Sequence, residues 1–558
     1  MCAEAGSSVI SGPHGAALRA TVLLDMPKPV CAAQTGFFCV PGRESEGFML
    51  QINHLTITHR KDLRTILDDF SFVLNRGDMA VLVGEEGNGK STLLKWIYDP
   101  ALIASYADAE GSRTTQGETL GYLPQELDAA DAEKTVYEFF RARRGFADAP
   151  PRTLVRTAAQ LALPEDVWYG AQRMGTLSGG EKVKLQLAAL LLDEPDILLL
   201  DEPSNDVDAE TLERLEALIN GWRGSVLYIS HDETLIERTA NRVVLLEQLR
   251  RKSVGRWTVA NVPFRQFMAE RAAAFAKQTQ EAGSERREEK KALEKFRRIQ
   301  QSVERAQENV SRADPSTGRL LKKKMASVKA TERRYAREHE EMTAYPESES
   351  PILIRFHTER KMPASKTVLD LRLPELCIGG RVLARDVELF VRGPEKVCIT
   401  GKNGVGKTTL LRAVARGLLT RGDVRACYMP QHYEETLDPD VTPLDFLVPS
   451  GDREALTTAR TYLGSLRYTA EEMEHPVRAL SGGQKAKLFL LKMCLADTDV
   501  LILDEPTRNF SPLSGPEIRA LLRAFPGAIL SVSHDRKYIA EVCTRVLRLT
   551  EDGLTELR

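Results

Sequence analysis

Four short apolar runs form the first pattern along the chain, at residues 80–83, 197–200, 397–400 and 501–503. They are continuous rather than alternating, which is typical of strands buried on both faces of a parallel sheet. The first and third lead into a glycine-rich loop and a helix-forming segment, whereas the second and fourth end in an Asp-Glu pair. The pattern predicts an α/β fold with polar groups gathered at strand ends.

A seven-residue apolar repeat marks the middle of the chain. Its members are Phe296, Val303 and Val310, then Ile299, Ala306 and Ala313, and, beyond residues 314–318, Leu321, Val328, Tyr335 and Met342. Two such stripes separated by Asp-Pro-Ser-Thr-Gly predict two helices that fold back as an antiparallel coiled coil. A first helix of some 45 to 50 residues would extend roughly 70 Å. Gly283 is a candidate interruption in it.

The segments that carry chemistry occur twice in the same order. Each set has a glycine-rich loop, a glutamine, the tetrapeptide Leu-Ser-Gly-Gly, an Asp-Glu pair and a histidine. In both sets the signature serine and the aspartate are 23 positions apart, and the glutamate and the histidine 29. This repeat indicates a duplicated domain. We expect domains at 49–262 and 351–558 with the helical hairpin at 263–350, preceded by a disordered or misassigned extension, or a regulatory tail, at 1–48.

The glycine-rich loops are predicted to bind the phosphates of ATP. Glycines let backbone amides converge on phosphate oxygens, and a helix amino terminus adds unpaired N–H groups. The loop lysine would reach the β and γ phosphates, and the following hydroxyl would bind Mg²⁺. The residues expected to contact nucleotide here are Gly84, Glu85, Glu86, Gly87, Asn88, Gly89, Lys90, Ser91, Thr92, Gly401, Lys402, Asn403, Gly404, Val405, Gly406, Lys407, Thr408 and Thr409.

Polar residues at further strand ends are predicted to complete each site. The aspartate would support Mg²⁺ through its water shell, and the following glutamate would polarise the attacking water. The histidine would hold the γ phosphate and this water in register, and the glutamine would complete the metal and water shell. The expected catalytic residues are Glu202, Glu505, His231 and His534. The expected metal-binding residues are Ser91, Gln125, Asp201, Thr408, Gln431 and Asp504.

By its phosphate loops, signatures, acidic pairs and histidines, the chain resembles the ATP-binding-cassette ATPases over roughly residues 49–558. The resemblance implies two domains paired head to tail, with each nucleotide between one domain's phosphate loop and the other's signature. The first composite site would join the Lys90 loop to the second signature, and the second composite site would join the Lys407 loop to the first. The signature residues expected to contact nucleotide are Ser481, Gly482 and Gly483, and Ser178, Gly179 and Gly180.

Two departures from the family pattern modify this expectation. The loop after the first acidic pair contains Asp208, whereas Ser511 stands at that position in the second copy. Communication across the two sites is therefore expected to be unequal, although both keep their glutamate and histidine. For the aromatic residue that often stacks on adenine, His59 is the candidate in the first half, and the second half offers none.

Composition narrows the class of protein. No stretch reaches the roughly 20 apolar residues of a membrane helix, so we expect a cytoplasmic protein rather than a membrane-spanning transporter. The eight cysteines include no Cys-x-x-Cys pair, and none lies between Cys39 and Cys377. This spacing argues against a zinc ribbon or a disulfide framework.

Positive charge is concentrated around the predicted hairpin turn. Residues 295–334 contain twelve basic and four acidic side chains, although the whole chain has a net charge of −2. A solvated hairpin needs no such excess, whereas a polyanion favours it through counterion release. Nucleic acid is therefore the predicted partner. The expected RNA contacts are Arg305, Arg312, Arg319, Lys322, Lys323, Lys324 and Lys329.

Two fused cassettes with a charged hairpin between them together resemble the ABC-F proteins. That resemblance implies a monomer with an internal pseudo-dimer of ATPase domains that binds the exit site of the ribosome, with its hairpin near the peptidyl-tRNA and the large-subunit RNA. The loop at 504–514 and the tip at 312–324 are most similar to members that protect ribosomes against lincosamides, pleuromutilins and streptogramin A. The alternatives are a housekeeping factor that rescues stalled ribosomes, the ATPase subunit of a membrane transporter, and a DNA-repair or chromosome ATPase.

Overall fold

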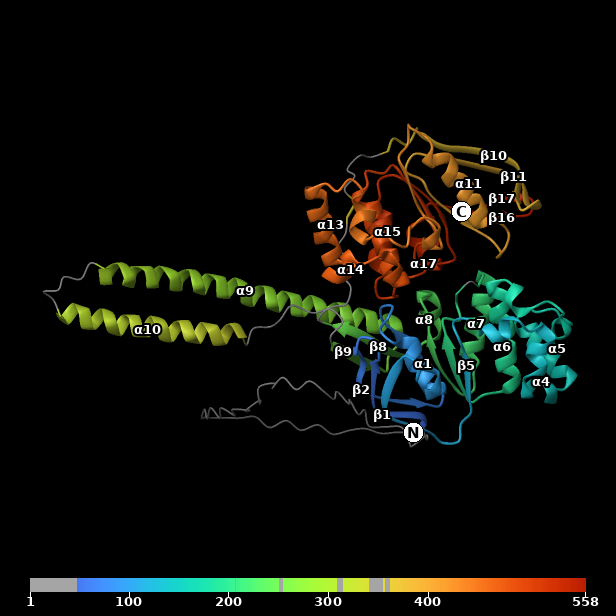
Figure 1. The fold of residues 1–558 in the computed structure, drawn as a ribbon, viewed down its shortest axis with the longest axis horizontal. Coiled ribbons are helices and arrows are strands. Elements are labelled where there is room, and N and C mark those ends of the chain that lie inside the picture. The colour runs from blue at the N-terminus through green and yellow to red at the C-terminus, as the bar shows by residue number, and fades with distance from the viewer. Residues whose placement is uncertain are drawn as a thin grey trace, which may run out of the picture. The chain divides into compact units, whose positions relative to one another are not determined.

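The computed structural model describes residues 48–205, 207–249, 254–308, 315–340, 355–356 and 362–557. Gly47–Arg558 forms one compact unit. Apart from Phe48, the predicted extension at 1–48 lies outside the described residues. Figure 1 shows two α/β domains and a long helical hairpin, and the hairpin comes between the two domains in the chain.

The first α/β domain is built on a six-stranded sheet. Its strands in spatial order are β5 (Leu120–Leu123), β6 (Ile197–Asp201), β7 (Ser225–Ile229), β3 (Met79–Val83), β8 (Arg242–Leu249) and β9 (Val254–Ala260). Every neighbouring pair is parallel except β8 and β9. Every residue of β3, β6 and β7 is buried. The apolar runs at 80–83 and 197–200 thus form central strands, as the sequence predicts.

Helices and a smaller sheet surround this core. The helices are α1 (Lys90–Tyr98), α2 (Ala129–Ala132), α3 (Val136–Arg141), α4 (Arg144–Asp148), α5 (Pro151–Gln160), α6 (Gly179–Asp193), α7 (Ala209–Asn220) and α8 (Glu233–Thr239). An antiparallel sheet has the order β2 (Thr65–Asn75), β1 (Phe48–His59) and β4 (Ala107–Thr115). Apolar residues from β1, β2 and α1 form one buried cluster with one side of the main sheet. The carboxyl ends of the parallel strands stay accessible to the loops that carry the motifs.

The second α/β domain repeats this plan. Its main sheet has the order β13 (Ala426–Met429), β14 (Val500–Asp504), β15 (Ala528–Val532), β12 (Lys396–Thr400), β16 (Arg545–Thr550) and β17 (Gly553–Glu556), with only β16 and β17 antiparallel. A two-stranded sheet pairs β10 (Thr367–Ile378) with β11 (Arg381–Arg392). The helices are α11 (Lys407–Leu419), α12 (Pro443–Leu447), α13 (Arg453–Ser465), α14 (Ala470–Glu474), α15 (Gly482–Leu495), α16 (Gly515–Ala524) and α17 (Arg536–Glu541).

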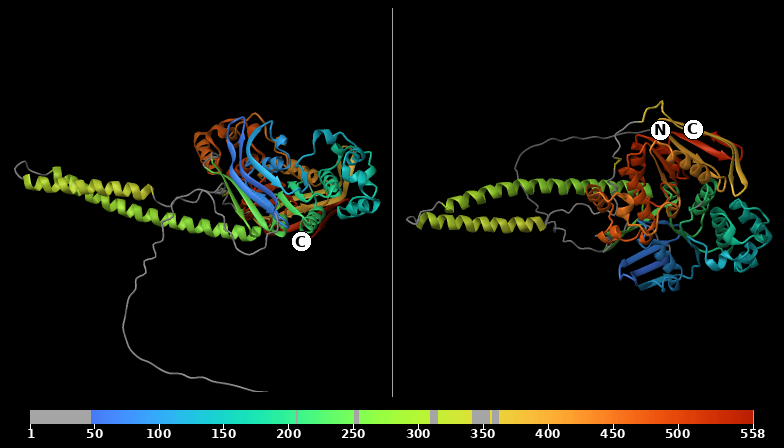
Figure 2. Two further views of the ribbon diagram at one scale, coloured as in Figure 1. Left: turned by 90° about the horizontal axis from the view of Figure 1, so that it is seen from below. Right: turned by 45° about the horizontal axis from the view of Figure 1, so that its top comes forward.

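Two long helices, α9 (Phe264–Glu308) and α10 (Pro315–Glu340), lie between the domains in the chain. Both views of Figure 2 show them running alongside each other. Phe264 anchors the start of α9 in the core of the first domain, where it is buried. The 45 residues of α9 agree with the predicted length. Phe296, Val303 and Val328 are the buried members of the hairpin core.

Three details of the hairpin differ from the predictions. Helix α9 continues through Gly283, because one glycine costs only about 1 kcal/mol in a helix of this length. Residues 315–318 form the first turn of α10 rather than a loop, since proline is well tolerated at the first helical position. Ile299 is 56% exposed, so its stripe does not face the partner helix there. Val310, Ala313 and Met342 lie outside the described residues.

Candidate functional site

Glycines with positive φ allow both phosphate loops to turn from strand into helix. Gly89, with φ 83°, precedes α1, and Gly406, with φ 101°, precedes α11. A Cβ atom at Gly89 would lie 2.0 Å from the Ile66 side chain. Both the backbone conformation and the close approach therefore require glycine at this position. The loops point helix amino termini at the carboxyl edge of each sheet.

The two loop lysines turn back onto their own loops. Lys90 Nζ donates to the carbonyl oxygens of Gly84 and Glu85, at 2.9 Å each. Lys407 Nζ donates to the equivalent carbonyls of Gly401 and Lys402, also at 2.9 Å. Both lysines are 8% exposed. Each loop thus encloses a cation that is positioned to meet phosphate oxygens.

A hydroxyl and a strand-end carboxylate meet in each domain. Ser91 Oγ donates to Asp201 Oδ1 at 2.9 Å, and the corresponding distance from Thr408 Oγ1 to Asp504 Oδ1 is 3.4 Å. Burial raises the pKa of each aspartate to about 6. Asp504 Oδ2 is buried and has no hydrogen-bond partner among the described residues. An oxygen pair of this kind suits Mg²⁺, which binds through few protein ligands together with phosphates and water.

The next residue in each strand end is a glutamate with unusual backbone geometry. Glu202 has φ 53° and Glu505 has φ 49°. A non-glycine residue in this left-handed region costs about 1 kcal/mol or more, and such strain clusters at functional sites. Glu202 Oε2 is buried and without a hydrogen-bond partner in the described part of the chain. Burial, reinforced by Asp504, raises the pKa of Glu505 to about 7.

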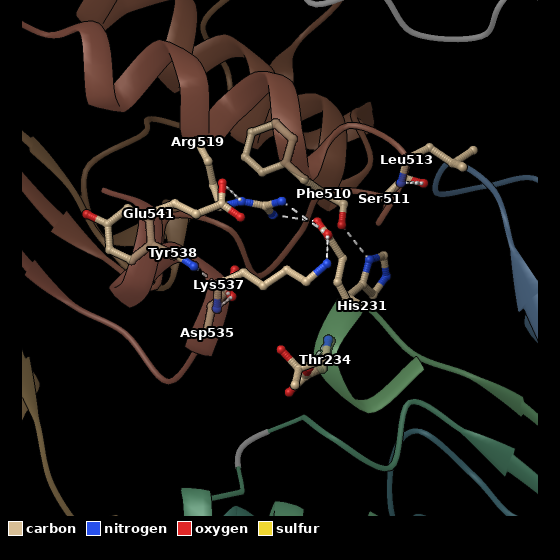
Figure 3. A network of polar contacts seen from close by, with 12 residues as sticks. His231, Thr234, Phe510, Ser511, Leu513, Arg519, Asp535, Lys537, Tyr538 and Glu541 are labelled. Carbon is tan, nitrogen blue, oxygen red and sulfur yellow. Dashed lines mark hydrogen bonds and ion pairs between the residues drawn. The ribbon is translucent and has the colours of Figure 1, made fainter. Parts of the chain in front are cut away.

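The two histidines lie beside these glutamates in different ways. His231 Nε2 is 3.0 Å from Glu202 Oε1. Figure 3 shows the other ring nitrogen of His231, Nδ1, which is 2.6 Å from the Phe510 carbonyl oxygen of the other domain. His534 Nε2 is 4.0 Å from Glu505 Oε1. Burial lowers the pKa of His534 to about 4, so this imidazole is neutral at physiological pH. For His231, burial lowers the pKa, but the Glu202 carboxylate outweighs that effect and leaves it raised.

A cavity of about 750 Å³ lies where the second composite site was expected. Its walls come from both domains, with Ser178 and Gly179 on one side and Lys407 and Thr408 on the other. Gln431, Asp504, Glu505 and His534 line it as well. The structure thus brings together the phosphate loop of one domain and the signature of the other. Gly180 is buried in the first turn of α6 rather than in the wall.

The same cavity has an apolar side that sequence reasoning missed. Ile378, the last residue of β10, and Arg381 and Leu383, at the start of β11, line it. The described residues that line the cavity include no Phe, Tyr or Trp. Aliphatic and cationic side chains therefore form the surface against which an adenine ring would be expected to lie. The sequence feature that could have pointed to this surface is the pair Gly379 and Gly380, which forms the turn of a β-hairpin.

The first composite site is closed by side chains of its own phosphate loop. The Gly483 amide N–H donates to Glu86 Oε2. Lys487 Nζ of α15 is 2.6 Å from Glu85 Oε2, and Ser514 Oγ donates to Glu85 Oε1 at 3.0 Å. These contacts join the Lys90 loop to the second signature, as the head-to-tail arrangement requires.

Two residues expected near the first phosphate loop make only local contacts or none within the described part of the chain. Gln125 is exposed in the loop that follows β5. His59 Nδ1 is 2.9 Å from Asp62 Oδ1, and its ring centroid is 6.4 Å from that of Tyr106.

The unequal loops after the acidic pairs make different contacts. Asp208 caps α7 by accepting a hydrogen bond from the Thr211 amide at 3.0 Å, and its charge opposes the lowering of the His534 pKa by burial and Lys407. Ser511 is buried, and its hydroxyl accepts from the Leu513 amide at 3.3 Å. The second loop instead presents the Phe510 carbonyl to His231. The two sites therefore differ in charge across the interface.

A buried ion-pair network beyond the motifs also joins the domains (Figure 3). Arg519 of α16 makes two hydrogen bonds to the Glu233 carboxylate of α8, at 2.6 and 3.1 Å. Lys537 of α17 contacts Glu233 at 3.0 Å and Glu237 at 2.6 Å. The sequence offered no signal for this network, because its members are ordinary helix residues far apart in the chain.

Comparison with known proteins agrees with this geometry. The ABC transporter family model matches residues 67–205 and 384–508, which include both phosphate loops and both signatures. The chain is a tandem ABC ATPase. Domains of this class bind and hydrolyse ATP. A crystal structure of the archaeal ribosome recycling factor aABCE1 with a stalk protein has a TM-score of 0.52 and 18% identity over 88% of this chain and 89% of that one, which supports the tandem fold.

The relatives of this ABC ATPase include ABC-F proteins. Ribosome protection protein VmlR of Bacillus subtilis (strain 168) is 25% identical over 88% of this chain and 85% of that protein. Tylosin resistance ATP-binding protein TlrC of Streptomyces fradiae is 28% identical over 90% of this chain and 98% of that protein. ABC transporter F family member 5 of Arabidopsis thaliana is 25% identical, with 88% and 74% covered. Within the described residues, no helix has the length and apolar character to cross a membrane.

The basic side chains of the hairpin are accessible where the structure describes them. Arg305, Lys322, Lys323, Lys324 and Lys329 are exposed. Arg312 lies outside the described residues, as does the side chain of Arg319. The described cations therefore face solvent. Lys322, Lys323 and Lys324 are called the tip lysines below.

Proposed function

We propose that this ABC ATPase is a cytoplasmic, ribosome-associated protein that protects the peptidyl-transferase centre from antibiotics. The observation that carries the proposal is the helical hairpin between two ATPase domains, with exposed tip lysines that suit RNA phosphates. The relatives named for ribosome protection and tylosin resistance support the same choice. In this proposal the protein docks at the exit site, and the hairpin reaches the peptidyl-tRNA and displaces drug or reshapes its pocket.

The proposed chemistry is hydrolysis of ATP at two composite sites. Lys90 and Lys407 would hold the phosphates, while Ser91 with Asp201, and Thr408 with Asp504, would hold Mg²⁺. Bound Mg²⁺ supplies charge neutralisation at the phosphates. Glu202 and Glu505 would each accept a proton from the attacking water, and the neighbouring histidine would orient that water. Gln431 would assist from the cavity wall, and the two signatures would cover the nucleotides from the opposite domain.

Replacement of both glutamates tests the link between hydrolysis and release. In the Glu202→Gln and Glu505→Gln double variant, we expect ATP hydrolysis to fall by about 10²- to 10⁴-fold, because the proton acceptor is lost. The ATP-bound protein should then cosediment with ribosomes and exchange slowly. Glu213→Gln, at an exposed glutamate of α7, is the matched control and should behave as the unmodified protein. Rapid exchange of the double variant would contradict the proposed cycle.

Shortening of the hairpin tests the protective role. We expect replacement of residues 312–324 by a short Gly-Ser linker to remove drug protection while ATP binding is kept. The measurement is the inhibitory concentration of a lincosamide, a pleuromutilin and a streptogramin A in a susceptible bacterium, beside fluorescent-ATP binding by the purified variant. Unchanged drug tolerance together with retained ribosome binding would favour a housekeeping factor instead.

A further inference from the structure

The two phosphate loops differ at the two positions that face the opposite domain. The first loop has Glu85 and Glu86, whereas the second has Lys402 and Asn403 at the same places. The helices that face them begin with similar signatures, and Lys487 of α15 corresponds to Lys184 of α6. The first composite site thus combines carboxylates with a lysine, and the second combines two lysines. Opposite charges attract only in the first.

Glu86 lies against both glycines of the second signature. Its Oε2 accepts the hydrogen bond from the Gly483 amide. A Cβ atom placed on Gly482 or Gly483 would come within 3.3 or 3.2 Å of the same oxygen, so the carboxylate fills the space that the glycines leave. The amide belongs to the first turn of α15, where unpaired N–H groups and the helix dipole favour an anion. The Glu86 carboxylate therefore occupies the anion-binding position at the amino terminus of α15.

Glu85 reinforces this contact from the neighbouring position. Its carboxylate pairs with Lys487 at 2.6 Å and accepts from Ser514 at 3.0 Å, and the Glu85 and Lys487 side chains are 13% and 11% exposed. Burial would raise the pKa of Glu85, but Lys487 and Ser514 outweigh burial and hold that pKa below its usual range. Glu85 is therefore ionised, and the loop is tied to α15 by a nearly buried ion pair.

The second composite site shows what the same place looks like without these carboxylates. There Asn403, Gly404 and Lys407 face Ser178 and Gly179 across the cavity of about 750 Å³. A nucleotide held by the Lys407 loop would direct its terminal phosphate across that cavity toward the signature. By the internal repeat, a nucleotide on the Lys90 loop would direct its terminal phosphate toward the Gly483 amide.

We propose that Glu86 competes with the terminal phosphate of ATP for the second signature, and so sets the nucleotide preference of the first composite site. Two anions cannot share the single Gly483 N–H, so ATP must displace the carboxylate before the signature can cover it. ADP lacks the γ phosphate and binds the loop without that displacement. The first composite site is therefore closed by its own side chains before ATP arrives, and the second composite site is the one that accepts ATP more readily.

The test measures ATP and ADP at one site only. A Lys407→Ala background removes the phosphate contact at the second composite site, and fluorescent ATP and ADP are titrated into the full-length protein. We expect Glu86→Asn to tighten ATP binding by about tenfold, the size of one charge-assisted hydrogen bond, and ADP binding by less than about twofold. Equal changes for ATP and ADP, or no change, would overturn the proposal.

The internal repeat offers a matched control. In a Lys90→Ala background, Asn403→Glu introduces the carboxylate into the second loop and should weaken ATP binding there by a similar factor, again with little effect on ADP. Glu86→Gln, which keeps the side-chain length, replaces Glu86→Asn if the latter shows an altered circular dichroism spectrum. The assay contains no ribosomes, so its outcome is independent of the proposed role in drug protection.

Discussion

The two strand-end glutamates share a backbone conformation but differ in their electrical surroundings. Both have positive φ, yet Glu202 lies 3.0 Å from His231, whereas Glu505 lies 4.0 Å from His534. Burial, reinforced by Lys407, lowers the pKa of His534 to about 4 and keeps this imidazole neutral. Burial raises the pKa of Glu505 to about 7, so this carboxyl group is protonated in about half of the molecules near neutral pH. Only the ionised form can accept a proton from water.

This raised pKa predicts a pH dependence for the second composite site. In the Glu202→Gln variant, the remaining hydrolysis depends on Glu505. We expect kcat/KM to rise about tenfold for each pH unit below about 7 and to level off above it, because kcat/KM reports the free enzyme. His534 stays neutral over this range and adds no second limb. The measurement is steady-state ATPase activity between about pH 5.5 and 8.5, and a flat profile would contradict the assignment of Glu505 as the proton acceptor.

Helices α8, α16 and α17 carry a group of buried polar contacts between the two domains. Arg519 is the centre of this group, because it pairs with Glu233 across the interface and with Glu541 in its own domain at 2.9 Å. The Arg519 side chain is 3% exposed. A buried pair of this kind contributes little net stability compared with apolar packing, but the loss of one partner leaves an uncompensated charge.

Removal of Arg519 should therefore destabilise the interface. We expect Arg519→Met to lower the stability of the folded protein by about 3 kcal/mol, the lower end for breaking a buried pair, since Lys537 still contacts Glu233. Urea unfolding followed by circular dichroism measures the change. Arg523→Met, at an exposed arginine of the same helix, is the control and should be nearly neutral. Glu233→Gln combined with Arg519→Met should recover part of the loss, and no recovery would contradict the pairing.

The hairpin shows how far an apolar repeat can be trusted for a pair of helices. Phe296 and Val303 are buried at heptad spacing, and the Phe296 ring meets Tyr335 edge to face with centroids 5.8 Å apart. Ile299 follows the same spacing but faces solvent. A period of seven identifies candidate stripes, whereas the rotation of one helix against its neighbour decides which stripe is buried. That rotation depends on contacts between helices and is not readable from either helix alone.

Across the whole molecule, positive charge is concentrated on the hairpin, whereas the rest of the chain is net negative. This distribution predicts how ribosome binding depends on salt. If the tip lysines meet RNA phosphates, their replacement by glutamine should weaken ribosome binding and reduce its dependence on salt. Each phosphate contact contributes nearly one to the slope of log affinity against log salt. We expect replacement of Lys322, Lys323 and Lys324 to lower that slope by about 2 to 3. Replacement by arginine keeps the charge and is the control, and an unchanged slope in the glutamine variant would contradict RNA contact at the tip.

The sequence determined the parts of this protein that depend on neighbours in the chain. Continuous apolar runs specify buried strands, glycines specify the loops after them, and Ser178 and Ser481 cap the signature helices with Glu181 and Gln484. Strand, loop and cap each depend on a few consecutive residues, so the two ATPase domains and their motifs were predictable. The duplicated spacing indicated two copies of one domain, whereas the pairing of one loop with the other signature was an expectation from the family resemblance alone.

Tertiary structure decided which side chains meet across the two domains. Glu86 reaches Gly483, Arg519 reaches Glu233, and Ile378 lines the cavity, although no local pattern connects them. The energy of such contacts depends on distance, burial and the neighbouring charges, which exist only after the chain is folded. Two loops that the sequence presents as equivalent therefore become unequal sites, because each faces a different set of charges in the opposite domain.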